Sequence, residues 1–176
     1  MNTNLQIGAY QIAYIRNTFQ FVMRSMKKLN LPEYNFRIQK SEKGLRIFDP
    51  LRKKFVSLTP EEWVRQNFIS YLIEEKKYPA SLIAIETGLT YNRLKKRSDI
   101  LIYDRKGNAW MIIECKKPDI KITQETFNQV AVYNMSNTTK TQYLAVTNGL
   151  KHYCCKMNDA GSRFDFLKTF PEFPEN

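Results

Sequence analysis

Two short apolar runs joined by a polar turn stand out in the pattern of hydrophobic and polar positions. The runs are residues 100–103 and 109–113, both rich in β-branched or aromatic side chains. The turn between them contains Asp104, Gly107 and Asn108. Apolar, β-branched runs bounded by turn-forming residues are typical of a β-hairpin. The pattern therefore predicts two paired antiparallel strands here.

The register of this hairpin brings charged residues together. If Asp104 faces Ala109, the pairing runs back along both strands until Asp99 lies opposite Glu114. Directly opposed residues share a face of the sheet. Lys116 follows Glu114 by two residues and therefore lies on the same face. We expect two carboxylates and a lysine at one end of an otherwise apolar hairpin.

Two like charges directly opposite each other destabilise a sheet unless a cation lies between them. Carboxylate oxygens are hard ligands that suit Mg²⁺. The alternative is a solvated pair of charges at a strand end. Apolar runs on both sides favour a buried sheet whose polar end opens into a cleft, so we interpret Asp99, Glu114 and Lys116 as a catalytic or metal site.

The remaining pattern predicts helices and further strands. Thr59-Pro60 begins a predicted helix that runs to about residue 77, with its core stripe at Val64, Phe68, Tyr71 and Leu72. A second helix is predicted from residue 123 to about 137. Further strands are expected at 35–39, 45–48, 82–86, 143–147 and 150–156, with a tight turn at Asn148-Gly149. Residues 90–97 are expected to be a loop or a strand, and a short terminal strand or irregular tail follows residue 158.

This order of elements predicts an α/β fold, with a central mixed β-sheet flanked by helices. The length of 176 residues fits one domain, which we place at residues 31–176, after an N-terminal extension at 1–30 that is expected to be helical. No run is long and apolar enough for a membrane span, and the N-terminus lacks a signal peptide. We therefore expect a cytoplasmic protein with no membrane contact.

The charge balance points to a polyanionic partner. The formal net charge is +11, which is typical of proteins that bind nucleic acid. Arg93, Lys95, Lys96 and Arg97 directly precede Asp99, so we predict that they contact phosphates, as does Lys117 beyond Lys116. The alternative is a merely solvated charged face.

Cysteine and histidine usage argues against two other classes of site. The chain has three cysteines, an odd number that does not favour a disulfide scaffold. Cys154 and Cys155 are neighbours without CxxC spacing, and His152 is the one histidine, so no zinc site is expected. Cys115 alternates with Glu114 and Lys116 and should face the opposite, buried side of the sheet.

Several of these segments together resemble a known family. The Asp99 strand followed by Glu114-Cys115-Lys116 resembles the D…ExK signature of the PD-(D/E)xK nuclease superfamily. More narrowly, the chain resembles the N-terminal nuclease domain of type I restriction enzyme R subunits over about residues 31–157. The segments that carry this resemblance are 59–66, 96–100, 114–118, 129–133 and 147–149. Ser98 departs from the proline found in many superfamily members, which removes no ligand.

The resemblance implies a restriction-endonuclease-like core and further site residues. It implies that Gln129 and Tyr133, one turn apart on the second helix, belong to the site. It also implies that a glutamate of the first helix approaches the metal. We assign this role to Glu62, with Glu61 close behind, although Glu62 could instead close a capping box with Thr59.

These observations lead to one hypothesis and one alternative. The hypothesis is a metal-dependent DNA endonuclease in which Asp99, Glu114 and the Cys115 backbone carbonyl hold Mg²⁺, with Mn²⁺ as a substitute, and Lys116 orients the attacking water. The chain has no P-loop, so motor, helicase or other restriction-system subunits would be separate partners. The alternative is a catalytically inactive nucleic-acid-binding module with the nuclease fold.

Overall fold

The described part of the chain begins after the predicted extension. A computed structural model describes residues 26–86, 88–91, 94–135, 141–158 and 163–175. Residues 1–25 lie outside this part, so the division of the chain near residue 30 stays a prediction.

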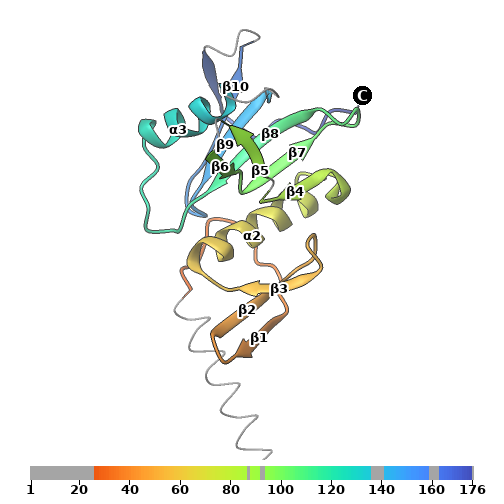
Figure 1. Cartoon of the computed structure of the whole chain (residues 1–176), viewed down its shortest axis with the longest axis vertical. Coiled ribbons are helices and arrows are strands. Elements are labelled where there is room, and N and C mark those ends of the chain that lie inside the picture. Colours follow the sequence, from red (N-terminus) through yellow and green to blue (C-terminus); the bar gives the residue numbers. More distant parts are fainter. Residues whose placement is uncertain (1–25, 87, 92–93, 136–140, 159–162, 176) are drawn as a thin grey trace, which may run out of the picture.

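A mixed six-stranded sheet forms the centre of the molecule (Figure 1). Its strands stand in the order β11-β10-β9-β8-β7-β4. They are β4 (Ile83–Ile85), β7 (Ile100–Tyr103), β8 (Ala109–Cys115), β9 (Tyr143–Thr147), β10 (His152–Met157) and β11 (Phe164–Leu167). Strands β8 and β9 run parallel and all other neighbours run antiparallel. The prediction of an α/β fold with a central mixed sheet is confirmed.

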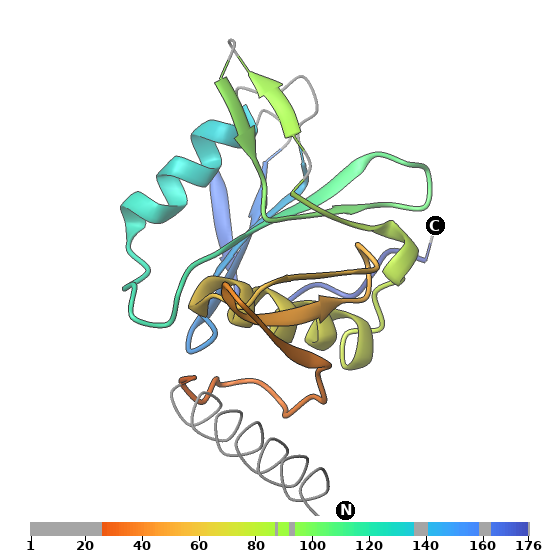
Figure 2. The same cartoon turned by 60° about the horizontal axis from the view of Figure 1, so that its bottom comes forward.

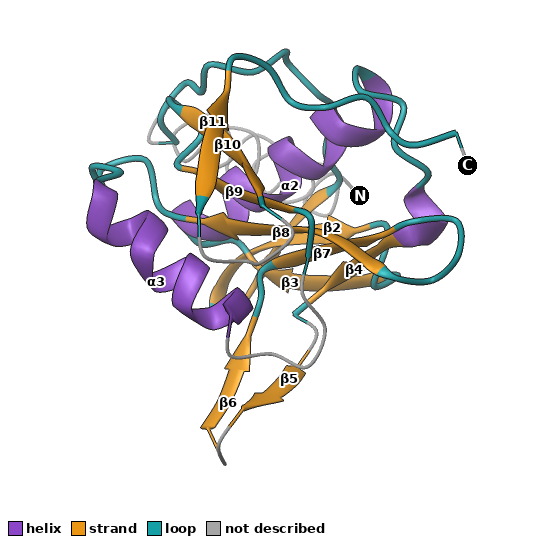
Figure 3. Cartoon of the chain, turned by 90° about the horizontal axis from the view of Figure 1, so that it is seen from above, coloured by secondary structure: helices purple, strands orange, loops and turns teal. Residues whose placement is uncertain are grey.

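Two helices cover opposite faces of this sheet (Figure 3). Helix α2 (Pro60–Glu74) packs on one face, and α3 (Gln124–Met135) packs on the other through Phe127 and Val130. Both lie close to the predicted helices, and Thr59 is the N-cap of α2, with Oγ1 accepting from the Glu62 amide at 3.0 Å. No helix in the described ranges has the length and apolar character needed to cross a membrane.

A separate antiparallel sheet lies on the far side of α2, so that the helix runs between two sheets (Figures 1 and 2). Its strands are β1 (Ile38–Ser41), β2 (Gly44–Asp49) and β3 (Lys54–Ser57), in sequence order. A short 3-10 helix, η1 (Ala80–Leu82), leads into β4, and a two-stranded ribbon, β5 (Gly88–Tyr91) with β6 (Leu94–Arg97), follows it. Strand β6 lies within residues 90–97, where a loop or a strand was predicted, whereas β3 and the start of β5 were not predicted.

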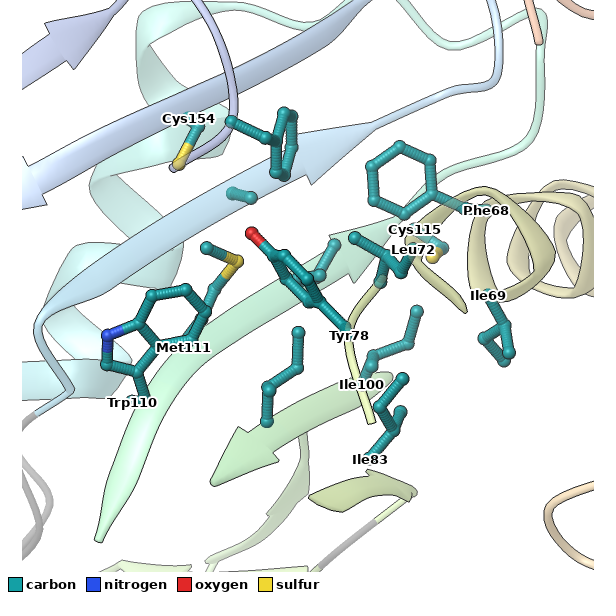
Figure 4. Close-up of a cluster of buried hydrophobic side chains, with 14 of the residues drawn as sticks. Phe68, Ile69, Leu72, Tyr78, Ile83, Ile100, Trp110, Met111, Cys115 and Cys154 are labelled. Atoms are coloured by element: carbon teal, nitrogen blue, oxygen red, sulfur yellow. The ribbon is translucent and has the colours of Figure 1, made fainter. Parts of the chain in front are cut away.

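The main core lies between α2 and the six-stranded sheet. Phe68, Ile69 and Leu72 of α2 pack against sheet residues such as Ile100, with Tyr78 between them (Figure 4). The Tyr78 hydroxyl donates to the Pro171 carbonyl at 2.6 Å, which ties the C-terminal tail to the core. Of the predicted helix stripe, Val64, Phe68 and Leu72 are fully buried and Tyr71 is partly buried.

The β7–β8 hairpin combines the predicted register with one irregularity. Ile100 faces Ile113, as expected, whereas Tyr103 faces Ala109 because Trp110 forms a β-bulge near the turn. The expectation that Asp104 faces Ala109 was therefore wrong by one residue. A bulge adds one residue to a strand and therefore shifts the pairing beyond it by one position. This shift offsets the one-residue error at the turn. The register at the Asp99 end is the predicted one.

The turn between β9 and β10 holds the segment that precedes the small sheet. The predicted Asn148-Gly149 turn is present, and Gly149 has a φ of 79°. A Cβ atom at this glycine would lie 2.6 Å from Leu29 Cδ2, and the Gly149 carbonyl accepts from the Asn30 amide at 2.7 Å. The glycine is required both for its backbone conformation and for this close approach.

We expect Gly149→Ala to lower the free energy of unfolding by more than the ~1–3 kcal/mol of a strained backbone alone. Chemical denaturation measures this effect. Gly107→Ala is the matched control because its φ of 83° carries a similar strain, while a Cβ there meets no atom within 4 Å. Equal losses in the two variants would show that the contact with Leu29 is unimportant.

Candidate functional site

Asp99 and Glu114 lie opposite each other at one end of the β7–β8 hairpin. Asp99 directly precedes Ile100, and Glu114 directly follows Ile113, and these two isoleucines are paired. Lys116 lies two residues beyond Glu114, and its Nζ is 2.6 Å from Glu114 Oε1. The Lys116 amide donates to the Thr147 carbonyl at 2.8 Å, so the sheet also fixes the lysine backbone. The three predicted residues thus lie together.

Both carboxylate oxygens of Asp99 accept hydrogen bonds. Arg65 Nη2 of α2 donates to Oδ1 at 2.6 Å, and the Cys115 amide donates to Oδ2 at 2.7 Å. The Glu86 amide, at the end of β4, donates to the Asp99 backbone carbonyl at 3.1 Å. Asp99 is therefore held by a helix, its partner strand and the neighbouring strand.

The electrostatics at this end of the sheet reflect crowded negative charge. Burial, and then the charge of Asp99, raise the pKa of the Glu114 carboxyl group. For Lys116, burial disfavours the ammonium form, but its hydrogen bond and ion pair with Glu114 outweigh burial and raise its pKa. Lys116 is thus a hydrogen-bond donor at neutral pH, and the folded state disfavours the charged form of Glu114.

Glu61 and Glu62 have different surroundings although they are neighbours in the first turn of α2. Burial, and then the charge of Asp99, raise the pKa of Glu61, and Lys116 also acts on it electrostatically. Glu62 is buried and binds Arg52 Nη2 at 2.8 Å, Gln66 Nε2 at 2.8 Å and Arg65. Glu61 therefore interacts electrostatically with Asp99 and Lys116, whereas Glu62 is engaged in ion pairs.

Two arginines join the small sheet to Asp99. Arg52 pairs with Asp49, Glu62 and Glu86, and Arg65 pairs with Glu62, Glu86 and Asp99. The side chain of Arg65 is only 7% exposed. Buried charges are tolerated only when they are paired and hydrogen-bonded. We call this set of side chains the arginine network, and its members are Asp49, Arg52, Glu62, Arg65, Gln66, Glu86 and Asp99.

The donor set can be compared with what a divalent cation needs. Within the described ranges, no three acidic, histidine or cysteine side chains are placed to hold a metal ion together. Asp99 and Glu114 supply two carboxylates, and Mg²⁺ commonly uses one or two carboxylates while it keeps several waters. Burial and then the charge of Asp99 raise the pKa of Glu114, so a cation beside both carboxylates would offset the second of these effects. Two carboxylates therefore fit a Mg²⁺ ion that keeps several waters, and they do not fit a metal ion held by protein ligands alone.

The other predicted site residues are placed less completely. The side chain of Cys115 is fully buried in the core on the α2 side, and Lys117 is exposed beyond β8. Gln129 and Tyr133 belong to α3, and Lys95, Lys96 and Arg97 belong to β6, but their side chains lie outside the described part. Arg93 also lies outside it. Their predicted roles stay predictions.

Sequence reasoning missed the arginine network. Its α2 members Glu62, Arg65 and Gln66 are three and four residues apart and therefore share one helix face. A polar face on a helix normally indicates solvent. Here that face meets the end of β2, where Asp49 is fully buried. The spacing was visible in the sequence, but its burial depends on a tertiary contact with the small sheet.

A comparison with known families identifies the chain. The family model described as type I restriction enzyme R protein N terminus matches residues 60–171. The match extends from the start of α2 past β11, so it includes Glu61, Asp99, Glu114 and Lys116 and omits β1–β3. A search of curated proteins found no match. Because the matched segment covers more than half of the chain, the protein belongs to the family of type I restriction enzyme R protein N-terminal domains.

Proposed function

We propose that this restriction nuclease-like domain is a metal-dependent DNA endonuclease that hydrolyses phosphodiester bonds. The observation that carries the proposal is the meeting of Asp99, Glu114 and Lys116 at one sheet end, with Glu61 facing them from α2. The net charge of +11 supports a polyanionic substrate. The family match supports DNA as that substrate and other restriction-system subunits as partners.

Asp99, Glu114 and the Cys115 carbonyl would hold Mg²⁺ or Mn²⁺. When bound, such an ion supplies Lewis-acid stabilisation and lowers the pKa of a bound water. Arg65 and the Cys115 amide orient the Asp99 carboxylate. Glu61 interacts electrostatically with Asp99 and Lys116, whereas Glu62 is engaged by Arg52 and Arg65, so we prefer Glu61 to Glu62 as the helix residue that acts on the ion.

Lys116 would act as a donor. Its raised pKa keeps the ammonium group charged at neutral pH, so it can donate to a water or to a phosphate oxygen. Its contact with Glu114 Oε1 holds the ammonium beside the proposed metal ligands. Orienting the attacking water and offsetting phosphate charge fit this state better than abstracting a proton from the water.

A second candidate is a catalytically inactive nucleic-acid-binding module. The observation that favours it is that Asp99 and Glu114 already have cationic partners, Arg65 and Lys116. A protein without metal could keep these pairs for stability alone. Cleavage of DNA in Mg²⁺ or Mn²⁺ but not in EDTA would decide for the endonuclease. Binding without cleavage across several metals would decide for this second candidate.

We expect Lys116→Ala to lower kcat for plasmid cleavage about 100-fold or more, because removing one positioned donor that stabilises developing charge costs roughly 10²–10³ in kcat. The assay follows conversion of supercoiled plasmid in Mn²⁺ over time. Lys106→Ala, at the exposed tip of the same hairpin, is the matched control and should cut at the wild-type rate. Full activity in Lys116→Ala would remove the lysine from the reaction.

Metal binding should raise thermal stability without any need for activity. A ligand at about 100 times its Kd adds ~2.7 kcal/mol, or roughly 5–10 °C in Tm for a chain of this size. We expect this shift for the wild type in Mn²⁺ relative to EDTA, and its loss in Asp99→Asn and Glu114→Gln. Differential scanning calorimetry measures all three proteins. Equal shifts in all of them would place the ion elsewhere.

The same melts in EDTA should separate the two carboxylates. A raised pKa means that the folded state disfavours the charged form of Glu114, and this cost is present above its folded pKa. Glu114→Gln should therefore be neutral or slightly stabilising at pH 7. Asp99→Asn should destabilise, because it leaves the buried Arg65 short of one partner. The reverse order would contradict the proposed electrostatics.

Neighbouring glutamates give a further test. Glu61→Gln should leave the free energy of unfolding unchanged or slightly higher and should weaken cleavage. Glu62→Gln removes one charge from buried ion pairs, which costs up to about 3–5 kcal/mol. Urea denaturation and plasmid cleavage are measured on both variants. An inactive but fully stable Glu62→Gln, beside an active Glu61→Gln, would restore Glu62 as the functional residue.

A further inference from the structure

A pocket of about 520 Å³ lies between the small sheet and the start of α2. The small sheet contributes Arg46, Lys54 and Ser57, and the helix side contributes Thr59, Glu61 and Arg65. β3 is an edge strand of its sheet, because β2 pairs with it on one side only. Pockets that take small ligands have volumes of roughly 300–1,000 Å³, so this one is large enough for part of a nucleotide.

The cations of this pocket fall into two groups. Arg52 and Arg65 form ion pairs with carboxylates of the arginine network. In contrast, Lys54 and Arg46 form no ion pair with any residue in the described part, and Arg46 donates to the backbone carbonyl of Phe55. Lys54 is exposed, while Arg46 is half-buried. In the strand register, Lys54 pairs with Asp49 and Arg46 with Ser57, so the two side chains start from opposite faces of the small sheet, and both line the pocket. They offer two positive charges to an external anion.

This pocket adjoins the proposed catalytic residues. Glu61 lines it and interacts electrostatically with Asp99 and Lys116. Arg65 lines it as well and donates to Asp99. Asp99 and Glu114 do not line it, so an anion held there would lie beside the proposed site and not within it. Lysine and arginine contacts to phosphates position a DNA strand without reading its sequence.

We propose that Lys54 and Arg46 bind a backbone phosphate next to the scissile one in the DNA strand that is cut. The proposal rests on the proposed function and names a subsite for its substrate. The subsite belongs to the small sheet, β1–β3, which lies outside the family match at residues 60–171. It is therefore a feature of this chain that the family assignment does not supply.

The test measures DNA binding separately from cleavage. A short fluorescein-labelled duplex is titrated with wild type, Lys54→Gln and Lys168→Gln in EDTA over a series of salt concentrations. Lys168 is the matched control because it is exposed and follows β11, the edge strand of the six-stranded sheet that lies opposite β4. Each lost phosphate contact makes the slope of log K against log salt less negative by about 0.9. We expect this change, and weaker binding, for Lys54→Gln, with the wild-type slope for Lys168→Gln.

Plasmid cleavage in Mn²⁺ is then measured on the same three proteins. Lys54→Gln should raise KM severalfold and leave kcat unchanged, because it removes binding and not chemistry. The same slope in Lys54→Gln as in the control would overturn the subsite while the nuclease proposal stands. A Lys54-dependent slope without any cleavage would support the phosphate contact and overturn the nuclease. A wild type that neither binds nor cuts DNA would overturn both.

Discussion

The buried guanidinium of Arg65 is the constraint on which the candidate site depends. A charge this well buried is stable only if carboxylates surround it, and Glu62, Glu86 and Asp99 do so. These three residues come from α2, the end of β4 and the start of β7. Arg65 therefore fixes the helix relative to two strands of the central sheet. That fixed relation places Glu61, the first-turn neighbour of Glu62, beside Asp99 and Lys116.

The same constraint explains how the fold tolerates so many acids at one place. Arg52, Arg65 and Lys116 neutralise part of the charge of the carboxylates around them. The pKa values of Glu61 and Glu114 are nevertheless raised. Burial is the largest cause of both shifts, and repulsion from Asp99 is the next. Under the proposed function, a cation beside these two carboxyl groups would offset the repulsion that remains.

Local patterns predicted the hairpin, both helices and the register at Asp99, because each depends on neighbours in sequence. The bulge at Trp110 was not predictable from alternation, since every residue of β8 except Glu114 is buried and the period of two is lost. The predicted register at Asp99 still holds, because the one-residue shift at the bulge offsets the one-residue error in the predicted turn. Which of Glu61 and Glu62 is engaged in the buried ion pairs could not be predicted either. Both fit the first turn of a helix, and only the position of Arg52 and Arg65 separates them.

The small sheet has an effect that reaches beyond its own residues. By covering part of the polar face of α2, it buries Asp49 and leaves Arg52 and Glu62 only slightly exposed. Ion pairs interact more strongly as water is excluded, and their partners lose freedom of orientation. Asp99 is then oriented by a chain of contacts that begins in the turn after β2, passes through Arg52 and Glu62, and ends at Arg65. A segment outside the family match therefore shapes the electrostatics of residues within it.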